Sequence, residues 1–192
     1  DSVMVLKRLA KTSPIPVTVV TRPSNDGFAV ANNEGIGQAK GKYLLLLNSD
    51  TIVQPNSLER LVIAMEDRPV EDLTSTTRSH QGKLDRLGIL AAALLNPDGT
   101  SQPQGGSFPT LISLACHMLM LDDLPLIGQW LPSTQHTGKR TPVSEVSDIL
   151  RQVDWVGGTA MLIRRAVIDE IGDLDEGIFM YGEDVEFCLR AR

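Results

Sequence analysis

The sequence contains little cysteine, few aromatic residues and no long apolar run. Its 2 cysteines, Cys116 and Cys188, form no Cys-x-x-Cys pair, which argues against a zinc site or a disulfide framework and is typical of a reducing compartment. No segment reaches the roughly 18 consecutive apolar residues that a membrane-spanning helix needs. The net charge of -6 lacks the basic excess of a general nucleic-acid-binding protein, so we expect no nucleic acid among the partners.

The length of the chain, 192 residues, suits a single domain with a sizeable core. Two polar stretches without clear periodicity, residues 69–86 and 133–147, are expected to be surface insertions in that domain. The chain begins at Asp1 without an initiator methionine, so we expect it to be a piece of a longer protein.

Four consecutive leucines lie in the most distinctive stretch, YLLLLNSD at residues 43–50. A short apolar run bounded by turn residues predicts a strand buried on both faces, as in a parallel sheet. Ligands of open α/β sheets bind beyond the carboxyl ends of the strands, where Asp50 stands. Asp50 is therefore a candidate metal ligand, although a plain turn that caps the next helix explains Asn48, Ser49 and Asp50 equally well.

Helical and strand patterns alternate along the chain, which predicts βαβ units and a parallel sheet. The sequence NPDG at residues 96–99 predicts a hairpin turn, and the pair Gly157-Gly158 inside a strand pattern indicates a bulge or a close backbone approach. Beside the leucine strand, we expect strands over residues 17–20, 87–95 and 153–163, and helices over residues 3–11, 28–39, 58–68 and 166–171 and after residue 183.

An apolar stretch at residues 110–121 predicts a helix that is too short to span a bilayer. Burial in the core is the favoured interpretation of this helix. The alternative is a patch that faces the acceptor or a membrane.

Two acidic positions are candidates for chemistry: Asp50 at a strand end, and Glu183-Asp184 at the expected start of a helix. Carboxylates also cap helix N-termini, so a structural role for Glu183 and Asp184 stays open. Two separated carboxylates suit metal-assisted displacement, in which one holds a cation on a diphosphate and the other takes a proton from a hydroxyl.

Four blocks of the chain resemble the family 2 glycosyltransferases, and most closely their bacterial rhamnosyltransferase-like branch. The blocks occur in the family's order and cover the chain from end to end. They are NDGFAVANNEGI at residues 25–36, GKYLLLLNSD at 41–50, WVGGTAMLIR at 155–164 and FMYGEDVEFCLR at 179–190.

The resemblance implies an α/β fold of the GT-A type, a Rossmann-like mixed sheet flanked by helices. It also implies inverting transfer of a sugar from a nucleotide-diphosphate donor, with a divalent metal, Mg²⁺ or Mn²⁺. Asp50 matches the metal-binding Asp of the family, and Asn48 stands in place of its first Asp and faces the nucleotide. Asp184, in the Glu183-Asp184 block, matches the general base.

Four further site residues follow from the same resemblance. Trp155, Gly157 and Gly158 match the strand that shapes the pocket for the donor sugar and the acceptor. Asn32 falls near the nucleotide, where many relatives have Arg. Relatives also begin with an additional strand and continue to a metal-binding His, so we expect this chain to be incomplete at both ends and weakly active alone.

The expected partners are a dTDP- or UDP-sugar and a saccharide or lipid-linked acceptor, which points to biosynthesis of a cell-envelope polysaccharide. The expected location is cytoplasmic, and peripheral attachment to the inner face of the membrane stays open. Two other functions compete with this one. They are a nucleotidyltransferase of similar fold, whose Gly-rich basic loop is not seen, and a non-catalytic module that binds sugar nucleotides or glycans.

Overall fold

The structure, a computed structural model, describes residues 2–66, 87–121 and 150–192. Both expected polar insertions, residues 69–86 and 133–147, lie outside the described residues. The elements are α1 (Ser2–Thr12), α2 (Phe28–Gln38), β1 (Tyr43–Leu47), α3 (Ser57–Glu66), β2 (Ile89–Ala91), β3 (Leu94–Leu95), β4 (Ser101–Gln102), β5 (Gly105–Gly106), α4 (Leu111–Met118), β6 (Trp155–Val156), β7 (Ala160–Arg164), α5 (Arg165–Ile171) and α6 (Glu183–Arg190).

The central sheet has the strand order β1-β7-β2, and β7 pairs antiparallel with both neighbours. The register places Leu44 opposite Ile163 and Leu47 opposite Ala160. The predicted parallel pairing is therefore wrong for these strands. The reason is where the chain enters β7: Asn48 N–H donates to Thr159 O at 2.9 Å, so β7 starts beside the end of β1 and must run in the opposite direction.

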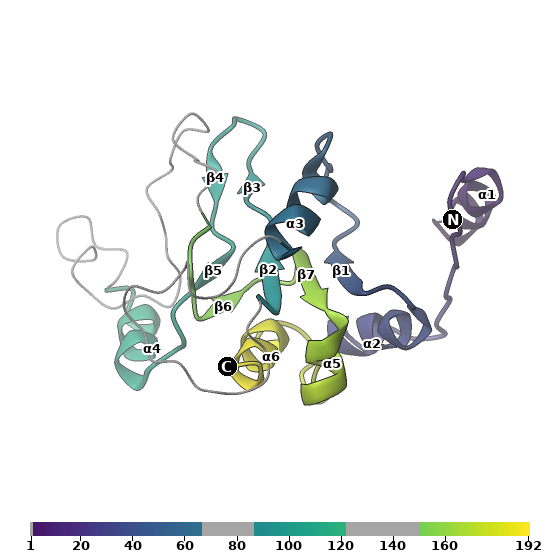
Figure 1. The fold of residues 1–192 in the computed structure, drawn as a ribbon. Coiled ribbons are helices and arrows are strands. Elements are labelled where there is room, and N and C mark those ends of the chain that lie inside the picture. The colour runs from purple at the N-terminus through teal and green to yellow at the C-terminus, as the bar shows by residue number, and fades with distance from the viewer. Residues whose placement is uncertain (1, 67–86, 122–149) are drawn as a thin grey trace.

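One face of this sheet carries the main hydrophobic core. Leu44 and Leu46 of β1 and Met161 and Ile163 of β7 are at most 5% exposed. Helices α2, α5 and α6 cover this face, as Figure 1 shows, and α3 lies on the other side of the sheet. The leucine strand is confirmed, but it is not buried on both faces, since Leu47 is 43% exposed.

Three expected strands differ from the structure. Residues 17–20 form no strand and, within the described part of the chain, pair with none, because β-branched residues favour a strand only where a partner is present. Residues 87–95 divide into β2 and β3, since the pairing with β7 ends where Ala92 N–H donates to Ala160 O. Residues 153–163 divide into β6 and β7 at the glycine pair.

The other local predictions hold with small changes. The hairpin is confirmed: Asn96 N–H donates to Thr100 O at 2.8 Å, and β3 pairs with β4. The expected helices form, and α3 is described up to Glu66. The apolar side chains of α3 are mostly exposed, since Met65 is its buried residue and Leu58 is 49% exposed.

Helix α4 forms where the apolar stretch predicted it, and Thr110 and Ser113 cap its N-terminus reciprocally. The expectation that this helix is buried in the core is wrong. Leu111 is 87% exposed and Met118 is 83% exposed, whereas Ser113 and Cys116 are the buried residues of the helix. Figure 1 shows why: α4 lies apart from the central sheet, so only a narrow face of the helix meets the rest of the domain.

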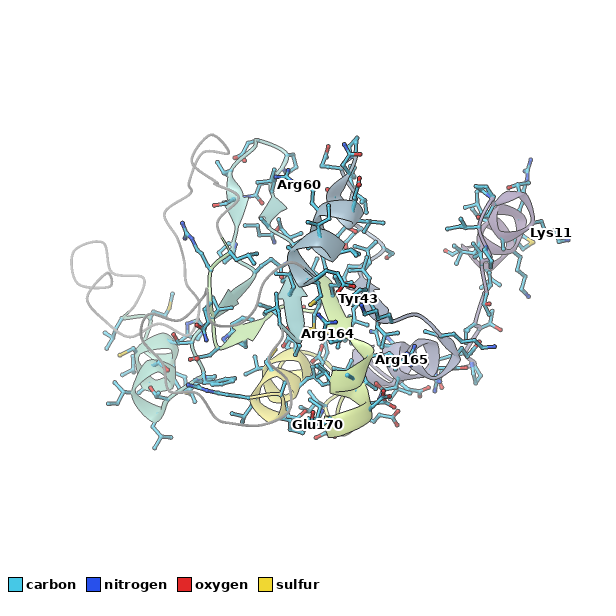
Figure 2. All side chains as sticks on the ribbon, in the orientation of Figure 1. Lys11, Tyr43, Arg60, Arg164, Arg165 and Glu170 are labelled. Atoms are coloured by element: carbon cyan, nitrogen blue, oxygen red, sulfur yellow. The ribbon has the colours of Figure 1, made fainter. Side chains whose placement is uncertain are left out.

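Arg164, at the end of β7, ties the sheet to the segments around it. Its side chain is 6% exposed and donates to the carbonyl oxygens of Met65 at 2.8 Å and Leu87 at 3.2 Å. A third bond reaches the hydroxyl of Tyr43, whose ring also lies beside the guanidinium (Figure 2). A buried cation is tolerated here because acceptors surround it.

We expect Arg164→Met to lower the free energy of unfolding by roughly 2–4 kcal/mol, because the buried acceptors lose a charged donor and no water replaces it. Urea denaturation measures the change. Arg151→Met is the matched control, because Arg151 is exposed, and it should change the midpoint little. Equal stability of the two variants would show that the Arg164 hydrogen bonds do not stabilise the fold.

Candidate active site

Most of the predicted site residues lie near the place where β1 ends and β7 begins. The backbone bond from Asn48 to Thr159 joins the two strand ends. Asn48 is half-buried, and Asp50 is exposed in the turn that follows. The carbonyl oxygen of Asn48 accepts from the hydroxyl of Thr51 at 2.7 Å, so the turn is held against the strand end.

The glycine pair between β6 and β7 allows two close approaches, as the sequence pattern predicted. A Cβ on Gly157 would lie 2.7 Å from Oε1 of Gln104, and a Cβ on Gly158 would lie 2.9 Å from the ring of Phe28. Without these side chains, the backbone N–H of Gly158 reaches Oδ2 of Asp184 at 3.2 Å. The turn after β6 thus contacts both α2 and the first residues of α6.

Asp184 lies in the first turn of α6 and is half-buried. Its Oδ1 accepts from the N–H of Val185 at 2.8 Å, while Oδ2 accepts from Gly158. These bonds are compatible with both roles predicted for Asp184, which are helix capping and chemistry. The bond from Val185 is local to the helix start, and the bond from Gly158 ties the carboxylate to a distant strand. Each carboxylate oxygen keeps a further lone pair that can accept from a ligand.

Glu183 points in the direction of the core rather than to solvent, since it shares the buried side of α6 with Phe187 and is 5% exposed. Its Oε2 has no hydrogen-bond partner in the described part of the protein. Burial raises the pKa of this carboxyl above its usual value, and the neighbouring charge of Asp184 raises the pKa further. The predicted catalytic pair therefore divides into a reachable Asp and a buried Glu.

A pocket of about 260 Å³ opens beside the glycine pair. Trp155 forms part of its wall and is held in place, since its Nε1 donates to Ser107 O at 3.0 Å. The residues that line the pocket are Gln102, Pro103, Gln104, Gly105, Trp155, Gly157 and Thr159. Two of the three predicted pocket residues, Trp155 and Gly157, thus lie on it, and Gly158 holds Asp184 next to it.

Asn33 and Arg190 position the segment before α6, and neither was predicted to be a site residue. The amide of Asn33 donates to Leu174 O at 2.8 Å and accepts from Leu174 N–H at 3.1 Å. Arg190 donates to the carbonyl oxygens of Ile171 and Asp173. The only local signal was the i,i+4 spacing of Glu186 and Arg190, which form an ion pair.

Asn32 is the predicted site residue that the structure does not connect to the others. Its Nδ2 donates to the carbonyl oxygen of Phe28 within α2 at 2.8 Å, and it does not line the pocket. In the described residues no group of three or more His, Cys, Asp or Glu side chains could hold a metal ion. A cation at Asp50 would therefore depend on oxygens from a ligand, as Mg²⁺ does when one or two carboxylates and phosphates bind it.

Comparisons with known proteins give a consistent result. A family model described as Glycosyl transferase family 2 matches residues 1–121. Rhamnosyltransferase WbbL of Escherichia coli K12 is 45% identical over 174 residues, which are 85% of this chain and 53% of WbbL. The N-acetylglucosaminyl-diphospho-decaprenol L-rhamnosyltransferase of Mycobacterium tuberculosis is 28% identical over 181 residues, 88% of this chain and 51% of that relative. The chain spans about half the length of these curated relatives.

A more distant relative comes from an archaeon. The low-salt glycan biosynthesis hexosyltransferase Agl10 of Haloferax volcanii is 26% identical over 172 residues, which are 88% of this chain and 44% of Agl10.

We expect Glu183→Gln to raise the melting temperature at neutral pH. Because the pKa of Glu183 is raised in the folded protein, the folded state keeps its proton at pH values where the unfolded chain has lost it. The stability of the wild type therefore falls as the pH rises from the usual Glu value through the raised pKa. The Glu183→Gln variant has no ionisable group at this position and does not lose stability in this way. The melting temperatures of the two proteins should therefore coincide at about pH 4 and separate above it.

Thermal melts of both proteins between pH 4 and 8 measure this effect. Glu170→Gln, on the exposed side of α5, is the control and should follow the wild type at every pH. Coincident curves for Glu183→Gln and wild type across the range would mean that the Glu183 carboxyl is not destabilised by burial.

Proposed function

Because the chain belongs to glycosyl transferase family 2, we propose that the protein transfers a sugar from a nucleotide-diphosphate donor to a glycan or lipid-linked acceptor, with inversion at the anomeric carbon. One observation carries the proposal. The Gly158 N–H···Asp184 Oδ2 bond of 3.2 Å fixes a carboxylate beside the pocket, at the same sheet edge as Asp50.

The family has the GT-A fold, so the predicted α/β fold class is confirmed. The described residues contribute a partial α/β domain in which the strand pairs are antiparallel. The pocket lies beside the start of β7, since Thr159 is one of the residues that line it.

Asp184 is the proposed general base. In a single displacement, the acceptor oxygen attacks the anomeric carbon while the bond from that carbon to the diphosphate oxygen breaks. The proton of the acceptor hydroxyl moves to the Asp184 carboxylate. The hydrogen bonds from Gly158 and Val185 support this role, because they orient the carboxylate before the acceptor arrives.

Asp50 is the proposed ligand for a divalent cation, Mg²⁺ or Mn²⁺, and Asn48 and Asn32 are the proposed contacts to the nucleotide. The exposed turn after β1 fits a cation, because its carboxylate is open to a diphosphate from the solvent side. A bound cation supplies positive charge that offsets the charge developing on the diphosphate. Of these residues, Asn32 has the weakest structural support, since its amide donates within α2.

The acceptor and sugar pocket is proposed to lie between Trp155 and the glycine pair. Gly157 lines the pocket and Gly158 contacts the base, so a saccharide in the pocket lies within reach of Asp184. A dTDP- or UDP-sugar is the proposed donor, and the relatives named as rhamnosyltransferases favour rhamnose as the sugar that is transferred. The M. tuberculosis relative is named for a polyprenyl-diphosphate acceptor, which supports a lipid-linked saccharide here.

Peripheral attachment to the inner face of the membrane is part of this proposal. No helix of the described residues is long and apolar enough to cross a bilayer. Helix α4 supports attachment instead, since Leu111, Leu114 and Met118 share one side of the helix and are exposed. Residues 99–121 include no Asp, Glu, Lys or Arg, and two acidic residues follow this uncharged stretch at positions 122 and 123.

We expect Asp50→Ala and Asp184→Asn to separate donor binding from transfer. Asp50→Ala should abolish the rise in melting temperature that Mn²⁺ plus dTDP or UDP produces, because the cation loses its carboxylate. Asp184→Asn should keep this rise and lose transfer to N-acetylglucosaminyl-diphospho-polyprenol by at least about 100-fold, because the amide cannot take the proton. Radiolabelled sugar in the lipid product measures transfer.

Asp169→Asn is the control for both readouts, because Asp169 is exposed on α5, away from the sheet edge. Full transfer by Asp184→Asn would remove Asp184 as the base. A melting shift by nucleotide that needs neither Mn²⁺ nor Asp50 would contradict the metal site. Saccharide binding with no transfer by the full-length protein under any condition would favour a non-catalytic glycan-binding module.

We expect the double variant Leu111→Ser and Met118→Ser to bind phosphatidylcholine vesicles at least about tenfold more weakly than the wild type, because two exposed apolar side chains are lost. Co-sedimentation with vesicles measures the change. The control is Met4→Ser with Leu9→Ser on α1, where the side chains are also exposed. Loss of binding in the α1 variant instead would assign attachment to α1.

A further inference from the structure

A short apolar segment directly before α6 is exposed although it lies next to the proposed base. Phe179 is 55% exposed, Met180 is 48% exposed and Tyr181 is 85% exposed. The hydroxyl of Tyr181 has no hydrogen-bond partner in the described part of the chain. Packing therefore gives no reason for an aromatic ring at this position.

The backbone of the same segment is strained at the tyrosine. Tyr181 has a φ of 65°, and Gly182 follows with a φ of 101°. Glycine adopts such angles freely, but a bulky residue with positive φ is an outlier that must be held by its surroundings. Strained residues of this kind gather at functional sites, so the outlier calls for a role other than packing.

Contacts on both sides hold the segment in place. Upstream, the carbonyl oxygen of Phe179 accepts from the N–H of Phe28 at 3.1 Å. Gly27 lies so close that a Cβ there would be 2.3 Å from this oxygen. Downstream, Asp184 is bound to the N–H of Gly158. Tyr181 therefore stands between two fixed points, three residues before the proposed base.

We propose that Tyr181 is an acceptor subsite, in which its ring stacks on the apolar C–H face of a pyranose ring of the acceptor saccharide. Aromatic rings suit this partner because the ring face is apolar and the tyrosine hydroxyl can bond to a sugar hydroxyl at the edge. The stacked saccharide presents a hydroxyl to Asp184. Phe179 and Met180 extend the apolar surface beside the ring.

The donor is a less suitable occupant of this subsite than the acceptor. The proposed metal ligand Asp50 and the proposed nucleotide contact Asn48 follow β1, and Asn32 lies on α2, whereas Tyr181 belongs to the loop that leads into α6. A bilayer is also less suitable, because Asp175 and Glu176 on the same loop are exposed and negatively charged. This inference rests on the proposed function, since it places the acceptor of that reaction.

Tyr181→Asn tests the inference, because Asn tolerates positive φ and removes the ring without forcing the backbone to move. We expect the acceptor KM to rise about 5- to 10-fold, as is typical for the loss of one aromatic contact, while the donor KM and the melting temperature stay unchanged. Tyr181→Phe keeps the ring and should retain most of the acceptor affinity. Ile15→Asn, at a position that is 67% exposed, is the matched control and should leave both KM values unchanged.

An unchanged acceptor KM in Tyr181→Asn would overturn the subsite and leave the transferase proposal intact, and so would a rise in the donor KM alone. Binding of a short-chain analogue of N-acetylglucosaminyl-diphospho-polyprenol, measured by saturation-transfer NMR without donor, separates the two proposals. If the wild type binds the analogue through Tyr181 but transfers no sugar, the subsite is supported and the transferase proposal is overturned. Absence of such binding would overturn the subsite.

Discussion

The pairing of β1 with β7 is the constraint on which the candidate site depends. All five residues of β7 are buried, and its register with β1 places Leu47 opposite Ala160. This register leaves Asn48 next to Thr159, so the turn with Asp50 and the turn with the glycine pair meet at one edge. A shift by one residue would turn Met161 and Ile163 away from the core, so burial of these side chains fixes the register and with it the site.

The position of Asp184 depends on a second set of contacts, all of them polar. Asn33 on α2 and Arg190 on α6 both bind backbone groups of residues 171–174. The segment between α5 and α6 is thus fixed from two sides, and α6 begins where its first turn can reach Gly158. Glu183 lies in the core beside this turn with one oxygen that has no hydrogen-bond partner in the described residues, so the helix start carries an energetic cost.

Two groups of apolar side chains remain exposed in the folded protein. The open side of α4 and the segment with Tyr181 both present apolar groups to solvent, on different elements and for different proposed partners. A lipid-linked saccharide combines the two chemistries, since its sugar ring suits an aromatic side chain and its polyprenyl chain resides in a bilayer.

The sequence by itself determined the local elements and the family. The leucine strand, the NPDG hairpin and the helix within residues 110–121 depend on neighbours along the chain, and each is found where it was expected. The direction of the strand pairs, the exposure of α4, the burial of Glu183 and the bond between Gly158 and Asp184 were decided only by the tertiary structure. These features depend on which distant segments pack together. A hydrophobic pattern predicts that a side chain can be buried, but it does not predict which segment covers that side chain.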